Sequence, residues 1–287
     1  MAKGMDVSKH QGVIDWEKVK ADGVEFAMLR AGYGRFDAQK DEYFEQNYAA
    51  ATAAGVPVGA YHYSYAKSVE DAATEAKTFL KWIAGKRFAY PVALDIEEEF
   101  QAQKGAAFVS DIIRAFCSTV EAAGYYVCIY ANKHWLETYV DADCKTKYDV
   151  WVAQWAAENT YSGAYGMWQA TSSGKVNGVQ GRVDLNVAYK DYPAIMSAKG
   201  LNGYAKKTPP AKPSKEFPPK TVLALYNTPL YVSSTAKTPS AHKSGTFYIY
   251  DGKELNGRYR ITSSAERAGK TPMADNVTGY VNKSDLR

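Results

Sequence analysis

Short apolar runs alternate with amphipathic stretches through the first two-thirds of the chain. The apolar runs are rich in Val, Ile, Ala and aromatic side chains and are bounded by turn residues, as is typical of buried strands. The predicted strands are 4–7, 24–30, 56–63, 90–96, 126–130, 150–155, 167–170 and 182–185. Between them, apolar residues recur at helical spacing. The predicted helices are 15–21, 41–54, 69–84, 106–123 and 132–139.

The order of these elements indicates an α/β fold. Strands that alternate with helices form a parallel sheet with the helices packed outside it. Because eight strands accompany only about five helices, we expect an irregular TIM-like β/α barrel whose last strands follow one another without full helices. An open doubly wound sheet is the alternative. The barrel is favoured because acids fall at the predicted carboxyl ends of the first, fourth and last strands, which a closed sheet brings to one rim.

A change of composition at residues 206–220 divides the chain. This segment holds five Pro and five Lys. Proline fixes φ and removes amide donors, so we predict an extended linker between a first domain, 1–205, and a second, 221–287. The second domain contains short strands separated by Asn-Thr-Pro, Asp-Gly and Asn-Gly turns. This pattern predicts a small all-β barrel.

The charge differs between the two domains. Residues 1–205 carry 21 basic and 25 acidic side chains, whereas residues 221–287 carry nine basic and five acidic ones. A basic tail on a mildly acidic body is typical of a protein that meets an anionic surface. Nucleic acid and an anionic cell wall are both candidates. No nucleic-acid-binding motif accompanies the charge, so nucleic acid is not expected as a partner.

Several kinds of segment and site are not expected. No apolar run is long enough to cross a membrane, and the first residues lack the apolar core of a secretory signal, so we expect synthesis in the cytoplasm without export by that route. The three cysteines, Cys117, Cys128 and Cys144, have no close spacing. This argues against a disulfide framework or a zinc site, and neither a metal nor another cofactor is expected.

The segment 90–97 carries the most informative chemistry. It is an apolar strand that ends in Asp95 and Glu97. Strand side chains alternate, so both carboxyls point the same way, with Cα atoms about 6.5 Å apart, and each raises the pKa of the other. This suits acid–base catalysis, in which one carboxyl stays protonated beside an ionised neighbour. A solvated acidic loop is the alternative, since Glu98 and Glu99 follow directly.

Eight blocks of sequence, in order, resemble the family-25 glycoside hydrolases, the lysozymes that cut bacterial wall glycan. The blocks are 5–16 (MDVSKHQGVIDW), 26–34 (FAMLRAGYG), 59–65 (GAYHYSY), 91–97 (PVALDIE), 129–132 (IYAN), 151–155 (WVAQW), 168–169 (WQ) and 183–186 (VDLN). The family fold, an irregular β/α barrel of five helices and eight strands, agrees with the elements predicted above. The resemblance implies β-1,4-N-acetylmuramidase activity, the hydrolysis of the bond between N-acetylmuramic acid and N-acetylglucosamine in peptidoglycan.

Carried over position by position, the resemblance implies roles for four acids. Glu97 resembles the general acid, Asp95 its partner, and Asp6 and Asp184 the other two acids of the cluster. The residue chemistry agrees, because a glycosidic oxygen needs a proton as it leaves and nearby acids raise the pKa of Glu97. Asp95 could serve as a nucleophile, as a base for water, or as the stabiliser of an oxazolinium formed by the 2-acetamido group of the substrate. The sequence leaves these three routes open.

Further polar and aromatic side chains fall near the predicted strand ends. A rim that stacks on sugar rings and binds the acetamido group could be lined by Tyr61, Tyr63, Tyr130, Trp155 and Gln169. Such side chains present a flat apolar face or an amide, which suits a glycan; packing in the barrel core is the alternative. Arg30 could orient a carboxylate or pair with Asp6. His62 points opposite to its tyrosine neighbours and is interpreted as a structural histidine.

The second domain resembles bacterial Src-homology-3-like wall-binding modules. The resemblance rests on 225–231 (LYNTPLY), 245–250 (GTFYIY), 257–262 (GRYRIT) and 277–281 (VTGYV). It implies binding to peptidoglycan of Gram-positive walls, which would concentrate the enzyme on its substrate; a stabilising domain is the alternative. The two domains together resemble a bacteriophage endolysin, which accumulates in the host cytoplasm and reaches the wall through a separate pore protein. A bacterial autolysin is the other possibility.

Three other functions agree less well with the sequence than a muramidase does. A chitinase or endo-β-N-acetylglucosaminidase also carries two acids at i, i+2 on a strand end, but the blocks around Asp6 and Asp184 count against it. A non-catalytic wall-binding protein is disfavoured because all four acids are retained. A nucleic-acid binder that uses the basic linker and tail is disfavoured by the catalytic blocks.

Overall fold

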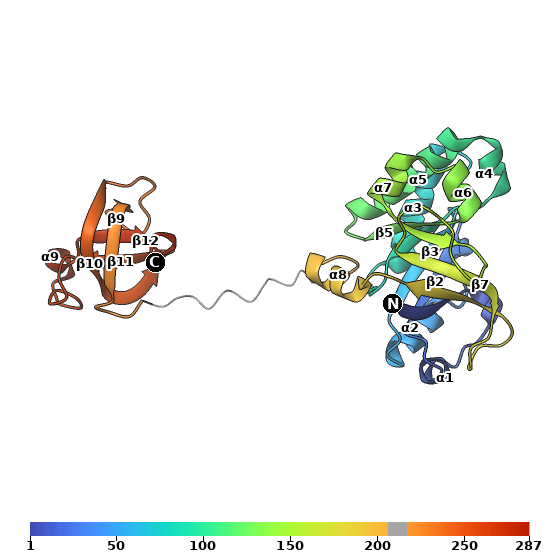
Figure 1. Cartoon of the computed structure of the whole chain (residues 1–287), viewed down its shortest axis with the longest axis horizontal. Helices are drawn as coiled ribbons and strands as arrows, with labels where there is room; N and C mark the ends of the chain where they lie inside the picture. Colours follow the sequence, from blue (N-terminus) through green and yellow to red (C-terminus); the bar gives the residue numbers. More distant parts are fainter. Residues whose placement is uncertain (206–216, 287) are drawn as a thin grey trace. The chain divides into compact units, whose positions relative to one another are not determined.

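The computed structural model describes residues 1–205 and 217–286 (Figure 1). The chain divides into two compact units, Met1–Lys207 and Thr208–Arg287. In the first unit, β1 to β8 form a closed barrel in sequence order. The prediction of an irregular β/α barrel is therefore confirmed.

The barrel strands are β1 (Ala2–Val7), β2 (Phe26–Tyr33), β3 (Val58–Tyr63), β4 (Val92–Asp95), β5 (Val127–Asn132), β6 (Asp149–Ala153), β7 (Met167–Gly174) and β8 (Val183–Ala188). The helices of this unit are α1 (Trp16–Ala21), α2 (Phe44–Ala53), α3 (Val69–Ile83), α4 (Glu99–Gln103), α5 (Ala106–Ala122), α6 (Lys133–Thr138), α7 (Ala142–Lys147) and α8 (Tyr192–Lys199). The predicted helices correspond to α1, α2, α3, α5 and α6. The additional α4, α7 and α8, of five, six and eight residues, are not among the predicted helices.

The last strand departs from a wholly parallel arrangement. β8 pairs antiparallel with both β1 and β7, whereas the other neighbouring strands pair in parallel. Within the described residues 149–188, no helix separates β6, β7 and β8. An antiparallel neighbour can be reached without the crossover helix that a parallel strand needs. The expected run of final strands without helices is confirmed, but the expectation of a parallel sheet is wrong for β8.

Period-two alternation sorts each barrel strand into an inner and an outer row. In β2, Phe26 and Met28 belong to the cluster inside the barrel, while Ala27 belongs to the cluster beneath the helices. Both rows are buried, which explains the continuous apolar runs in the sequence. The ring of Phe26 stacks on Tyr90 inside the barrel, with centroids 4.2 Å apart. Gly4 on β1 permits this, because a Cβ there would overlap the Phe26 ring.

The second unit is a curled antiparallel half-barrel with strands in the order β12-β11-β10-β9, so the prediction of a small all-β domain is confirmed. Its elements are β9 (Val222–Leu230), β10 (Ala241–Leu255), β11 (Arg258–Thr262), α9 (Met273–Asn276) and β12 (Gly279–Asn282). Residues 221–226 and 230–232 are predicted as separate strands, but β9 covers most of the first, continues through the Thr-Pro pair predicted as a turn, and ends at Leu230. Phe217 is buried against Tyr259 in the core of this unit. Packing thus begins within the predicted linker, whose residues 206–216 lie outside the described part.

Three observations bear on the kinds of site in the described chain. No helix in residues 1–205 or 217–286 combines the length and apolar character needed to cross a membrane. The same residues contain no group of three or more His, Cys, Asp or Glu side chains placed to hold a metal ion. All three cysteines are buried thiols without disulfide partners.

Candidate active site

The inner row of several strands ends in polar side chains at one rim of the barrel. On β4, Ala93 lies in the interior cluster, so the two-residue period places Asp95 in the same row. A cleft of about 200 Å³ opens at this rim. Nine of the ten predicted site residues line it: Asp6, Arg30, Tyr61, Tyr63, Asp95, Glu97, Tyr130, Gln169 and Asp184. Trp155 lies outside the lining.

Asp184 reaches the rim from the opposite end of its strand. It is the second residue of β8, so the prediction that it stands at a strand's carboxyl end is wrong. Because β8 runs antiparallel to β1, its first residues lie beside the last residues of β1, and Asp184 pairs with Asp6. The two acids therefore come together as predicted.

Asp6 is buried and held by two side-chain amides. Its Oδ2 accepts hydrogen bonds from Gln169 Nε2 at 2.9 Å and from Asn186 Nδ2 at 2.8 Å. Burial, and next the charge of Asp184, raises the pKa of Asp6 to about 8. Burial also raises the pKa of Asp184, although its hydrogen bond with Asp6 opposes the rise. The raised pKa favours the protonated form of Asp6 near neutral pH.

Asp95 and Glu97 differ in their exposure to the cleft. Asp95 is only 5% exposed, and its Oδ1 has no hydrogen-bond partner among the described residues. Burial, followed by the charge of Glu97, raises the pKa of Asp95 well above its usual value. Glu97 is half-buried, and its pKa is raised by burial and then by the charge of Glu98. Crowding among these carboxyls favours retention of a proton near neutral pH.

Gln169 orients other groups of the cleft. Its Oε1 accepts hydrogen bonds from Tyr130 Oη at 2.9 Å and from Trp155 Nε1 at 3.0 Å, and its Nε2 donates to Asp6. Gln169 is 2% exposed, so most of its hydrogen-bonding capacity serves the protein. Trp155 is 64% exposed. Its ring therefore faces solvent at the rim while its N–H is fixed by Gln169.

Arg30 pairs with Asp41 rather than with Asp6. Its Nε lies 2.8 Å from Asp41 Oδ2, and Asp41 also accepts the backbone N–H groups of Lys9 and Tyr43. Among the described residues, the buried Arg30 Nη2 has no hydrogen-bond partner. The guanidinium thus keeps a donor at the cleft, and its charge opposes the rise in the pKa of Asp95 that burial causes.

The tyrosines of β3 contact different neighbours. Tyr61 meets Trp151 edge to face, with ring centroids 6.1 Å apart. Tyr63 Oη donates a 2.7 Å hydrogen bond to Glu98 Oε1, so Glu98 is held at the cleft and the solvated-loop interpretation does not apply to it. His62 is fully buried among aromatic rings, as expected of a structural histidine.

Residues 5–179 match the family described as Glycosyl hydrolases family 25. The chain belongs to this family. The match includes Asp6, Asp95 and Glu97, and it ends shortly before Asp184 and before the second unit.

Known relatives of this family-25 chain include lysozymes and autolysins. The autolytic lysozyme of Clostridium acetobutylicum is 28% identical over 185 residues, which cover 64% of this chain and 55% of that protein. The structure of the CTP1L endolysin is 28% identical and covers 70% of each chain, with a TM-score of 0.61. The Streptococcus pneumoniae autolysin LytC, solved with a synthetic peptidoglycan ligand, is 30% identical, with a TM-score of 0.58 over 66% of this chain and 46% of LytC. The chain thus spans about half the length of the curated lysozyme.

Two residues that organise this glycoside hydrolase cleft are missing from the sequence-based prediction. Trp151 lines the cleft, and its Nε1 donates a 2.8 Å hydrogen bond to Asn186 Oδ1. Asn186 in turn donates to Asp6. Both lie in sequence blocks shared with the family, and two-residue spacing from Ala153 and Asp184 places them in the inner rows of β6 and β8. That period is the signal by which they could have been found.

A second cavity, of about 370 Å³, lies on the basic side of the cleft. It shares His10, Arg30 and Tyr63 with the acidic cleft. Further lining comes from Lys9, Tyr33 and Tyr65. The glycoside hydrolase site is therefore polar from end to end, with carboxyls at one side and cationic and aromatic side chains at the other.

Proposed function

We propose that this chain hydrolyses the β-1,4 bond between N-acetylmuramic acid and N-acetylglucosamine in bacterial peptidoglycan. The observation that carries the proposal is the convergence of Asp6, Asp95, Glu97 and Asp184 in one cleft with tyrosine walls. Membership of family 25 supports glycoside hydrolysis. The names of the relatives, an autolytic lysozyme and an autolysin solved with a peptidoglycan ligand, support the wall glycan as substrate.

Glu97 is assigned as the general acid. It is less buried than Asp95 and lines the cleft, where a glycan would lie. Its pKa is raised by burial and by Glu98, so the carboxyl can keep a proton near neutral pH. Transfer of that proton to the glycosidic oxygen lets the leaving sugar depart as a neutral alcohol.

Asp95 is assigned as the partner that meets the positive charge developing on the sugar. Asp95 lines the cleft, and its buried Oδ1 has no hydrogen-bond partner among the described residues. The charge of Arg30 opposes the rise that burial and Glu97 cause in the pKa of Asp95. A carboxylate here can stabilise the anomeric centre or hold the N–H of the 2-acetamido group while its carbonyl oxygen attacks. The proton on Asp6 limits the negative charge that must be confined nearby.

The Glu97→Gln variant tests the assignment. Glutamine keeps the shape of the side chain but has no transferable proton, so we expect kcat on solubilised glycan to fall by about 10²- to 10⁴-fold. Glu99→Gln is the matched control, because Glu99 is exposed two residues further on; it should retain normal turnover. Near-normal kcat in a folded Glu97→Gln protein would remove Glu97 as the acid.

We further propose that the second unit binds the wall and that the chain acts as an endolysin-type enzyme. The likeness to the CTP1L endolysin supports this role. Tyr226 is 89% exposed on β9, which gives the sheet an aromatic contact point. The guanidinium of Arg258 lies 3.5 Å from the centroid of the Tyr231 ring. The exposed ring of Tyr226 and the half-buried pair of Arg258 and Tyr231 suit an anionic glycan.

A further inference from the structure

The first unit contains a large cavity at the end of the barrel opposite the acids. It has a volume of about 750 Å³. Its walls include residues at or just before the starts of β3, β4 and β5, namely 55–58, 85–87, Ala89 and Tyr125. The acids lie where these strands end. Because β3 rises by about 3.3 Å per residue, the two sites are separated by about 17 Å, and no single sugar can occupy both.

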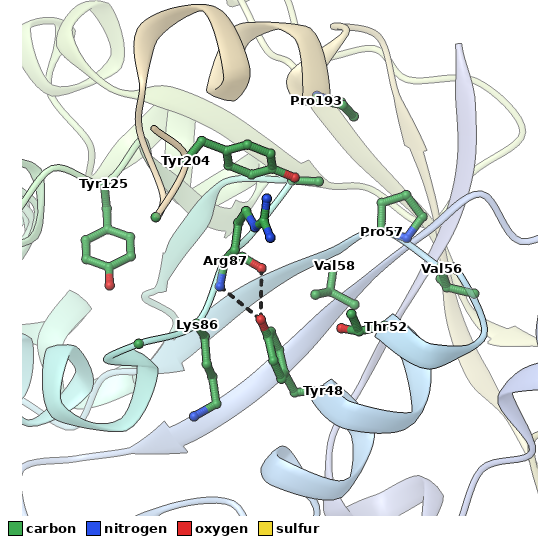
Figure 2. A pocket seen from close by; sticks show the side chains of 14 residues that line it. Tyr48, Thr52, Val56, Pro57, Val58, Lys86, Arg87, Tyr125, Pro193 and Tyr204 are labelled. Atoms are coloured by element: carbon green, nitrogen blue, oxygen red, sulfur yellow. Dashed lines mark hydrogen bonds between the residues drawn. The ribbon is translucent and has the colours of Figure 1, made fainter. Parts of the chain in front are cut away.

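Three tyrosines from different segments line this cavity (Figure 2). Tyr48 comes from α2, Tyr125 precedes β5, and Tyr204 follows α8. The hydroxyl of Tyr48 accepts the Arg87 N–H at 2.9 Å and donates to the Arg87 carbonyl at 3.2 Å. Within the described chain, no hydrogen bond engages the hydroxyls of Tyr125 and Tyr204. These rings offer flat faces and free hydroxyls, a combination that suits a sugar.

The cavity is positively charged. No Asp or Glu occurs among its described lining residues, which include Lys86 and Arg87. Lys86 is neutralised by Glu45, 2.9 Å away. Arg87 lies 5.1 Å from the centroid of the Tyr204 ring, and no carboxylate of the described residues forms an ion pair with it. A cation in an aromatic cavity without a protein anion favours an anionic ligand.

The walls are tied together by one buried residue, Asn202. Its backbone N–H donates to Gly124 and its carbonyl accepts from Phe88, both at 3.0 Å. Its side chain accepts from the Tyr126 N–H at 2.7 Å and donates to the Tyr90 carbonyl at 2.8 Å. Residues 88–90, residues 124–126 and Asn202 are thereby joined before a ligand binds, which lowers the entropy cost of binding.

Gly203 allows the closest approach of two of these segments. A Cβ at this position would lie 2.6 Å from the carbonyl oxygen of Lys86, and φ is +81°. Glycine is therefore required for Tyr204 to fold over Arg87. The sequence Asn202-Gly203-Tyr204 builds one wall of the cavity rather than simply trailing from α8.

We propose that this cavity is a second carbohydrate site, which binds an acidic sugar of the wall glycan away from the point of cleavage. A muramic acid unit that carries no stem peptide has both required parts: a ring to stack on tyrosine and a free lactyl carboxylate to pair with Arg87. The proposal rests on the proposed function for the identity of the glycan. It does not rest on hydrolysis, because a site remote from the acids binds without cutting.

The test is an NMR titration of the isotope-labelled full chain with N-acetylmuramic acid, a monosaccharide that offers no bond to cleave. The neutral sugar N-acetylglucosamine is titrated in parallel. We expect N-acetylmuramic acid to shift the signals of residues 86–88 and 203–204 at lower concentration than N-acetylglucosamine. Arg87→Gln should weaken binding at these residues by about ten-fold or more, the usual loss when a charge-assisted hydrogen bond is removed.

Lys77→Gln is the matched control, because it removes one exposed positive charge from α3 and leaves the cavity intact. Equal weakening in both variants, or shifts confined to the acidic cleft, would overturn the proposal. Tighter binding of glycerol 3-phosphate at residues 86–88 would overturn the sugar assignment in favour of a phosphate polymer. A chain that binds N-acetylmuramic acid here but cuts no peptidoglycan would contradict the proposed function and leave this site standing.

Discussion

The buried carboxyl of Asp6 contacts two amide donors and one acidic neighbour. A neutral asparagine can make the same contacts. Asparagine Oδ1 can accept the N–H groups of Gln169 and Asn186, and its Nδ2 can donate to Asp184, as protonated Asp6 does. Asp6→Asn therefore tests whether the proton is present in the folded protein.

We expect Asp6→Asn to stabilise the protein only at higher pH. The pKa of Asp6 is raised from 3.8 to about 8 on folding, so the native state holds a proton that the unfolded chain releases. The stability that depends on this proton is complete below about pH 4 and is lost as the pH rises towards 8, at up to about 1.4 kcal/mol per pH unit. The Tm of the variant should match wild type at pH 4 and exceed it at pH 9.

Thermal unfolding followed by circular dichroism at pH 4, 6 and 9 measures this difference. Asp143→Asn, at an exposed position in α7, supplies the control for loss of an acid. A difference between Asp6→Asn and wild type that does not change with pH would mean that Asp6 is already ionised in the native protein.

Most of the site follows from positions at strand ends, but the pairing of its side chains does not. Two-residue spacing puts Asp95 and Glu97 on one face, and that inference needs only the geometry of a strand. Whether Arg30 pairs with Asp6 or with Asp41 depends on how a loop folds back onto the rim, which no local pattern encodes. For the same reason, the sequence does not predict that Gln169 orients Asp6.

At the scale of the elements, strand existence was predictable and strand direction was not. An apolar run reads the same whether its strand is parallel or antiparallel, so nothing in residues 183–188 distinguishes β8 from a parallel strand. In the second unit, a Thr-Pro pair is typical of a turn, yet it lies inside β9, the terminal strand of the sheet, where proline is tolerated.

Asn202 joins the segment after α8 to the two segments that lead into β4 and β5. Glycine accepts its positive φ of 55° but leaves the Tyr126 N–H and the Tyr90 carbonyl without partners. We expect Asn202→Gly to reduce the free energy of unfolding by about 2–4 kcal/mol, since each buried unpaired group costs about 1–3 kcal/mol. Denaturant unfolding of the full chain measures this change.

Asn256→Gly is the matched control, because Asn256 has a similar φ of 50° in an exposed turn of the second unit. It should alter the free energy of unfolding by much less. Similar losses in the two variants would show that backbone conformation, and not the buried hydrogen bonds, sets the cost at Asn202.

In the proposed function of the whole molecule, the first unit hydrolyses the glycan and the second unit attaches the enzyme to the wall. Tethering raises the local concentration of the enzyme on an insoluble substrate but does nothing for a soluble one. Removal of residues 206–287 should therefore reduce lysis of intact Gram-positive walls more than cleavage of soluble glycan fragments. Turbidity assays and fragment assays on the same preparation compare the two losses. Equal losses would argue against a targeting role.

The proposed function depends most directly on which glycosidic bond of the wall glycan is cut. Purified Gram-positive peptidoglycan, digested with the full chain and reduced with borohydride, can be read by mass spectrometry for its new reducing ends. A muramidase should leave reduced muramic acid at these ends, and digestion with the Glu97→Gln variant should leave no new ends. Reduced glucosamine ends would instead place the chain with the glucosaminidases, and the absence of new ends would contradict its assignment as a muramidase.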